Sequence, residues 1–109
     1  MSRRPVPTFG YIHRHFMMSG VELASARRSI VECAISQGST VRAIFVDEVN
    51  TAPAALVQLI EAITERGNGV VIVPSLLHLS ALGNPLDVRR DLHANGFEVH
   101  ISDNPAVRR

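Results

Sequence analysis

The sequence predicts an α/β fold: a three-layer αβα sandwich around a mostly parallel sheet of four or five strands. Two observations carry this prediction. Four strand-like segments alternate with three helical segments, and this alternation calls for right-handed crossovers with helices on both faces of the sheet. Residues 69–74 (GVVIVP) are also apolar throughout, as expected of a central strand that is buried on both faces.

The first predicted strand covers residues 8–15 (TFGYIHRH) and changes character towards its end. Phe9, Tyr11 and Ile12 suit a buried strand, but residues 13–15 are histidine, arginine and histidine. Such side chains are costly at a strand end unless that end faces water, a ligand or a partner. The end of this strand is therefore a candidate site.

A helix is predicted over residues 19–38. Ser19 and Glu22 have the spacing of a capping box, and Gly38 closes the segment. An apolar stripe with a period near 3.6 marks its buried face. Its members are Leu23, Ala26, Ile30, Cys33 and Ala34.

The middle of the chain repeats the strand-to-helix pattern. Residues 41–46 (VRAIFV) form the second predicted strand, and residues 52–67 form the second helix. Pro53 lies in the first turn of this helix and Gly67 follows its end, which is the usual placement of both residue types.

The last helix–strand pair follows the strand at 69–74. A helix is predicted over residues 84–96, with Asn84 as its cap and Gly96 as its stop. Residues 97–101 (FEVHI) form the fourth strand. The chain is thus predicted to hold one domain at residues 9–101, with a loose leader at 1–8 and a loose tail at 102–109.

Composition limits the classes of function. The net charge of +1 provides neither a broad basic face for nucleic acid nor an acidic tail. No apolar run approaches the ~18 residues that span a bilayer. Cys33 is the single cysteine, so no internal disulfide can form and a reducing, cytoplasmic compartment is expected. Eleven arginines and no lysine suggest a GC-rich bacterial genome.

In parallel α/β sheets, ligands collect at the carboxyl ends of the strands. Here those ends carry residues 13–15 after the first strand, Asp47 and Glu48 after the second, and residues 74–80 (PSLLHLS) after the third. These segments are the expected site.

The order of these segments resembles the N-terminal catalytic domain of serine site-specific recombinases, the resolvase and invertase family, especially its large type. The family opens with a strand Y-x-R-V-S, and residues 11–15 read YIHRH in that frame. Its first helix, G-x-x-L-x-x-Q-R-x-x-L before a glycine, is matched within residues 20–38. The family's D-E after the second strand is matched by Asp47 and Glu48. The family then has an R-P pair, and this chain has Ala52 and Pro53 at those positions.

The likeness continues to the end of the domain. Where the family reads L-D-R-L-S-R after the third strand, residues 76–81 read LLHLSA, and residues 91–101 resemble its final helix-to-strand passage. The resemblance covers roughly residues 9–101. It implies a resolvase-like fold and, in intact members, a serine that attacks a DNA phosphodiester.

Every catalytic position that the resemblance assigns is changed in this chain. His15 stands at the serine nucleophile, and Leu77 stands at the aspartate. The family's arginines hold phosphate oxygens and offset transition-state charge. Their positions hold His13, Ala52, His78 and Ala81. The resemblance therefore implies an inactive, non-enzymatic domain that needs no cofactor.

The chain also stops at Arg109, without the long helix and DNA-binding domain that the family places after the catalytic domain. We therefore expect a stand-alone interaction or regulatory module, acting as a homodimer or with a protein partner, with no membrane role and little support for DNA binding. A role as an accessory recombination factor beside an intact recombinase is an open alternative.

A second alternative uses the histidines. His13 and His15 share one face of the strand, and the family frame places His78 near them. With Asp47 or Glu48 as a further ligand, this cleft could hold Zn²⁺, or His15 could act as a phosphate nucleophile. The competing interpretation is that no metal binds and that these histidines are solvent-exposed residues in a cleft that no longer holds a ligand.

Other reactive residue types have plainer interpretations. Arg14 alternates to the strand face opposite His13, and Asp47 with Glu48 is read as an exposed turn. The Arg27–Arg28 and Arg89–Arg90 pairs read as solvated helix faces. Cys33 reads as a small core residue, and His93 and His100 read as surface residues.

Overall fold

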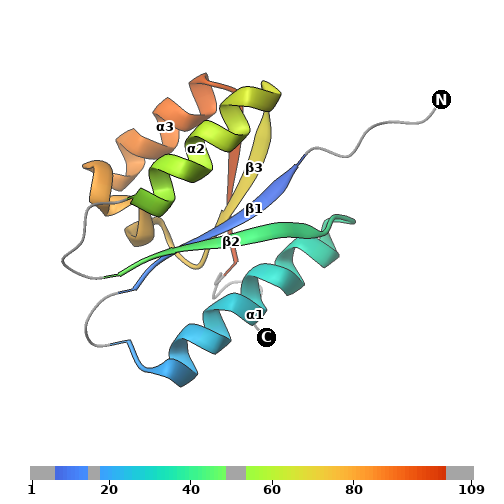
Figure 1. Ribbon diagram of the computed structural model, residues 1–109, viewed down its shortest axis with the longest axis vertical. Coiled ribbons are helices and arrows are strands. Elements are labelled where there is room, and N and C mark those ends of the chain that lie inside the picture. The colour runs from blue at the N-terminus through green and yellow to red at the C-terminus, as the bar shows by residue number, and fades with distance from the viewer. Residues whose placement is uncertain (1–6, 15–17, 49–53, 103–109) are drawn as a thin grey trace.

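The computed structural model describes residues 7–14, 18–48 and 54–102, apart from the side chains of residues 81 and 82. Strands and helices alternate along these residues (Figure 1). The elements in chain order are β1 Thr8–His13, α1 Gly20–Ser36, β2 Val41–Asp47, α2 Ala54–Arg66, β3 Gly69–Val73, the 3₁₀ helix η1 Leu76–Leu82, α3 Pro85–Ala94 and β4 Phe97–Ile101.

The described strands form one four-stranded sheet in the order β2-β1-β3-β4, and every neighbouring pair is parallel. Helix α1 covers one face, and α2 and α3 cover the other (Figure 1). The predicted αβα sandwich and parallel sheet are confirmed, with four strands rather than five in the described part of the chain. Strand β3 lies inside the sheet and is buried along its whole length, as its apolar sequence predicts.

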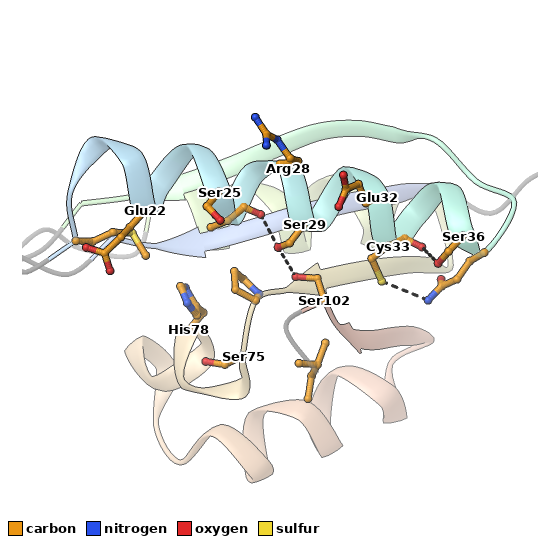
Figure 2. A pocket seen from close by; sticks show the side chains of 15 residues that line it. Glu22, Ser25, Arg28, Ser29, Glu32, Cys33, Ser36, Ser75, His78 and Ser102 are labelled. Atoms are coloured by element: carbon orange, nitrogen blue, oxygen red, sulfur yellow. Dashed lines mark hydrogen bonds between the residues drawn. The ribbon is translucent and has the colours of Figure 1, made fainter. Parts of the chain in front are cut away.

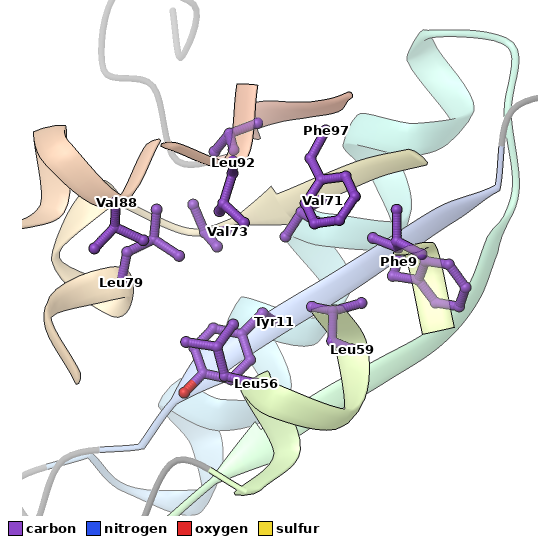
Figure 3. Packing of buried hydrophobic residues seen from close by; sticks show 12 residues of the cluster. Phe9, Tyr11, Leu56, Leu59, Val71, Val73, Leu79, Val88, Leu92 and Phe97 are labelled. Atoms are coloured by element: carbon purple, nitrogen blue, oxygen red, sulfur yellow. The ribbon is translucent and has the colours of Figure 1, made fainter. Parts of the chain in front are cut away.

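Two apolar clusters fill the spaces between the layers. The larger lies between the sheet and the α2–α3 layer, where Tyr11, Leu59 and Leu79 are fully buried (Figure 3). The smaller lies under α1 and centres on Ile30 and Ile72. Burial of apolar surface on both faces is the main favourable contribution to such a fold.

The start of α1 follows the predicted capping box. The Ser19 Oγ accepts a hydrogen bond from the Glu22 N–H, and the Glu22 carboxylate accepts one from the Ser19 N–H, each at 3.1 Å. Asn84 caps α3 through its side chain, because its Oδ1 accepts from the Leu86 N–H at 3.0 Å and from the Asp87 N–H at 3.4 Å. These bonds satisfy N–H groups that have no partner inside the helix.

Gly10 lets α1 approach the sheet closely. A Cβ atom at this position would lie 2.7 Å from Ile30 Cγ2, closer than carbon atoms pack. The helix end is set by Gly38, whose φ of +76° lies in the left-handed region that glycine adopts without strain.

The element boundaries differ from the sequence expectation in three places. Strand β1 begins at Thr8, one residue before the expected domain start, and ends at His13 rather than at residue 15. Pro7 also belongs to the fold, since its carbonyl oxygen accepts a hydrogen bond from the Val70 N–H at 2.8 Å. Residues 76–82, for which no helix or strand is predicted, form η1. No helix in the described residues is long and apolar enough to cross a membrane.

Candidate functional site

The parallel sheet brings the carboxyl ends of its strands to one edge. His13 ends β1 and Asp47 ends β2, and these two residues are register partners. η1 follows β3 at the same edge and carries Leu77 and His78. The site predicted from sequence is therefore assembled at one edge, as far as its residues are described.

His13 and His78 meet at this edge, as the sequence predicts. The His13 N–H donates a hydrogen bond to His78 Nδ1 at 2.9 Å. A ring nitrogen that accepts a hydrogen bond carries no hydrogen, so the neutral ring of His78 holds its hydrogen on Nε2. Neither nitrogen then offers a lone pair to a cation.

The side chain of Asp47 lies inside the protein, so the predicted exposed turn is wrong for this residue. Asp47 is 5% exposed. Its Oδ2 accepts from the Tyr11 hydroxyl at 2.7 Å and from the Leu56 N–H at 3.1 Å, while its Oδ1 accepts from the Ala55 N–H at 2.8 Å. Both oxygens are thus engaged by the protein, and the carboxylate ties the start of α2 to β1. It is not placed as a ligand in an open cleft.

The buried phenol of Tyr11 is one of the hydrogen-bond donors to the Asp47 carboxylate. Burial raises the pKa of Tyr11 far above its usual value, and the hydrogen bond and negative charge of Asp47 raise it further. The phenol therefore stays protonated and acts as a hydrogen-bond donor.

Glu48 and Arg14 lie at the surface beside this pair. The Arg14 guanidinium is 3.7 Å from the Glu48 carboxylate. Exposed ion pairs of this kind contribute about 0–1 kcal/mol. Arg14 follows the last residue of β1, so the predicted alternation of strand faces does not extend to it.

Several predicted positions cannot be placed here. His15 and Ala52 lie outside the described residues. Ala81 lies in η1, and Leu77 on the same helix is 73% exposed. Among the described residues, no group of three or more histidine, cysteine, aspartate or glutamate side chains is arranged to hold a metal ion.

Sequence reasoning missed a groove of about 740 Å³ between α1 and the carboxyl ends of β3 and β4 (Figure 2). Ser25, Ser29 and Ser36 line it from α1, and His78 and Ser102 line it from the opposite side. The Ser29 and Ser102 hydroxyls are hydrogen-bonded at 2.9 Å. The signal in the sequence was the spacing of the three serines along one side of α1.

Cys33 also borders this groove. It is partly buried against the apolar cluster under α1, and burial raises the pKa of its thiol. Because the thiolate is the reactive form, the raised pKa makes this cysteine less nucleophilic. Its place agrees with the expected core role.

The paired arginines lie on exposed helix faces, as expected. Arg27 and Arg28 are exposed on α1, and Arg89 and Arg90 on α3. Arg90 lies 3.3 Å from the Asp87 carboxylate.

These features define an α/β domain with a four-stranded parallel sheet and a polar edge at the strand ends. Its fold is that of a serine recombinase catalytic domain. Among solved structures, it is similar to the C-terminal catalytic domain of ISC1926 TnpA, an IS607-like serine recombinase, with a TM-score of 0.75. The match covers 92% of this chain and 69% of that chain at 14% sequence identity. The resemblance inferred from sequence is thus confirmed for the fold.

No protein-family profile matches the chain, and no curated protein matches it.

Proposed function

We propose that this chain is a catalytically inactive, serine-recombinase-like domain that acts as a protein-interaction or regulatory module linked to DNA recombination. In this proposal it works in the bacterial cytoplasm, as a homodimer or bound to a protein partner. The fold supports the link to recombinases, and the residues at the strand ends support the loss of chemistry.

The observation that carries the proposal is the hydrogen bond between His13 and His78. The resemblance assigns a phosphate-binding arginine to each of these positions. An arginine would offer a permanent charge and a bidentate fork to phosphate. His78 instead accepts a main-chain hydrogen bond with Nδ1, so its ring is neutral and has at most one N–H to offer a phosphate oxygen.

A second observation concerns Leu77, which takes the place of the family's aspartate. Its side chain is 73% exposed and has no charge or hydrogen-bonding group. Together with histidine in place of serine at residue 15, this leaves the expected positions without a hydroxyl nucleophile or a carboxylate.

The test is formation of a covalent protein–DNA adduct. The full chain is incubated with supercoiled plasmid carrying the genomic DNA that flanks its own gene, denatured with detergent, and assayed for DNA that precipitates with protein. We expect no adduct above the level of a His15→Ala variant. An adduct or nicked plasmid that the His15→Ala variant does not form would overturn the proposal.

A further inference from the structure

Strand β4 has one side without a partner strand among the described residues. The sheet order β2-β1-β3-β4 places it at an edge, where it pairs with β3 alone. The Gly96 carbonyl and the Ser102 N–H, at its two ends, bond to β3 at 3.3 and 2.9 Å. Alternate residues of a strand direct their main-chain groups to opposite sides. Phe97, Val99 and Ile101 therefore direct their N–H and C=O groups to the open edge, which can template another strand.

A groove of about 500 Å³ lies between β4 and helix α3. Residues 98–100 line it from β4, and Leu86, Arg89, Arg90 and His93 line it from α3. We call this space the edge groove. The four α3 side chains are exposed, so they are not used to pack the helix onto the sheet. They are available to a strand that is added beside β4.

The edge groove carries more positive than negative side chains. No ion pair of Arg89 is found among the described residues, whereas Arg90 lies 3.3 and 4.0 Å from the carboxylates of Asp87 and Asp91. These pairs are exposed to water and therefore weak. Glu98 is the one carboxylate among the described lining residues, and its Oε1 lies 3.0 Å from a histidine ring nitrogen of the same strand. The edge groove thus favours a negatively charged occupant.

From these observations we propose that the open edge of β4 binds an extended acidic segment of another protein, which adds a fifth strand to the sheet. The main-chain groups of this segment bond to Phe97, Val99 and Ile101, and its carboxylates meet Arg89 and Arg90 in the edge groove. The inference gives a partner chemistry to the proposed interaction role, and it rests on that role.

The two faces of β4 predict the residue pattern of the acidic segment. Phe97 and Val99 pack into the cluster between the sheet and the α2–α3 layer, so the same face of an added strand meets α3. The other face of β4 carries Glu98 and His100. Carboxylates are therefore expected at every second residue of the segment, on the α3 side. Uncharged residues are expected between them, because a carboxylate there approaches Glu98.

Three other occupants meet these requirements less well. A phosphodiester backbone supplies acceptors, but the open C=O groups of β4 require hydrogen-bond donors. A second copy that pairs antiparallel through β4 brings the arginines of both α3 helices to one face of the joined sheet, where like charges repel. The last residues of the chain itself include Arg108 and Arg109, which the arginines of α3 also repel. An acidic peptide strand supplies both the donors and the charge.

The test is fluorescence anisotropy of a labelled peptide of about nine residues, with glutamate and threonine alternating, titrated with the full chain. We expect saturable binding that weakens as salt is added. Arg89→Glu/Arg90→Glu reverses two charges in the edge groove, and the dissociation constant is expected to rise at least ~10-fold. The matched control is Arg27→Glu/Arg28→Glu, since this pair is exposed on α1, across the sheet. It makes the same change in net charge and should leave the dissociation constant unchanged.

N-methylated peptides test the main-chain hydrogen bonds. Methyl groups on one alternate set of residues block the N–H groups that face β4, whereas methyl groups on the other set point to solvent. One set should therefore raise the dissociation constant at least ~10-fold, and the other should leave it nearly unchanged. A peptide with lysine in place of glutamate should not bind, because it meets Arg89 and Arg90 with like charge. Circular dichroism of each variant checks that the fold is intact.

The inference is overturned if the acidic peptide does not bind the wild-type chain, or if both methylated sets bind equally well. Binding that is as tight to the Arg89→Glu/Arg90→Glu variant as to the wild type also overturns it. A wild-type dimer that excludes the peptide would assign the edge to a second copy. A DNA duplex that displaces the peptide, and that the same variant does not bind, would assign the groove to nucleic acid. Either result replaces the acidic segment.

These outcomes differ from failure of the proposed function. A chain that binds no peptide and forms no DNA adduct removes only the acidic partner. A chain that binds the peptide and forms an adduct removes only the proposed inactivity.

Discussion

The hydrogen bond between Tyr11 and Asp47 predicts how stability depends on alkaline pH. Tyr11 is fully buried, and burial together with the Asp47 carboxylate raises its pKa. A group whose pKa is raised on folding contributes stability that is complete below its unfolded pKa, here about 10. That stability is lost as the pH rises further, because only the unfolded state releases the proton.

The composition isolates this titration. The chain has one tyrosine, no tryptophan and no lysine, and its eleven arginines stay charged throughout. Cys33 is the other side chain that loses a proton in this range, and its raised pKa acts in the same direction. A Cys33→Ser background therefore leaves Tyr11 as the group that sets the pH dependence.

In that background, the free energy of unfolding is expected to fall by nearly 1.4 kcal/mol per pH unit above pH 10, or about 2 kcal/mol by pH 11.5. The assay is denaturant unfolding followed by circular dichroism at each pH. Ultraviolet absorbance follows the phenolate of the same single tyrosine, and it should appear only as the chain unfolds.

The control is Tyr11→Phe in the same background. It loses about 1–2 kcal/mol at neutral pH, because the hydrogen bond to Asp47 is gone, but its stability should be nearly constant from pH 9 to 11.5. The reasoning is refuted if phenolate forms near pH 10 while the fold persists, or if Tyr11→Phe loses stability with pH as steeply as its parent.

Four further predictions concern stability and DNA binding. Asp47→Ala leaves three donors without their acceptor and should lower the free energy of unfolding by about 3–5 kcal/mol in denaturant titrations; a loss below 1 kcal/mol would contradict its structural role. Gly10→Ala should cost about 1–3 kcal/mol through its contact with Ile30, whereas Gly20→Ala, with open space around it, should cost nothing. Ser19→Ala should lower stability by about 1 kcal/mol, measured the same way, and no loss would contradict the capping box. In mobility-shift assays, any DNA binding should disappear between 50 and ~200 mM salt, and a shift that persists would favour an accessory DNA-binding role.

The sequence predicts the elements well where local chemistry decides them. The capping box at Ser19, the cap at Asn84 and the glycines after the helices act within a few residues, so short patterns reveal them. The apolar run of β3 identifies an inner strand because helices cover both faces of the sheet at this strand. The fold class follows from the alternation of strands and helices along the chain.

The missed features depend on contacts between distant residues. Asp47 and Glu48 look equivalent in the sequence. Asp47 is nevertheless buried, because Tyr11 and the start of α2 provide hydrogen-bond donors to it. Tyr11 is 36 residues away along the chain, so no local pattern shows this contact. η1 spans seven residues without a side-chain cap, too short for periodicity to mark. The serine spacing along α1 is visible in the sequence, but the groove beside α1 exists because of how α1 sits relative to β3 and β4, which no local pattern encodes.

The carboxyl edge and the groove beside α1 both hold polar groups that have partners within the protein. At the edge, the polar groups bond to the protein itself: Asp47 holds Tyr11 and the start of α2, and His78 holds the end of β1. A site kept for a phosphate would hold its charged groups towards the ligand, since electrostatic stabilisation requires donors aimed at the developing charge. The groove beside α1 shows the same use of its polar groups, because the Ser29 hydroxyl is bonded to Ser102 and to the Ala26 carbonyl, and the Ser36 hydroxyl donates to the Cys33 carbonyl. Because the edge groups are engaged by the protein itself, their arrangement supports the proposal that this edge has lost the family's phosphate chemistry.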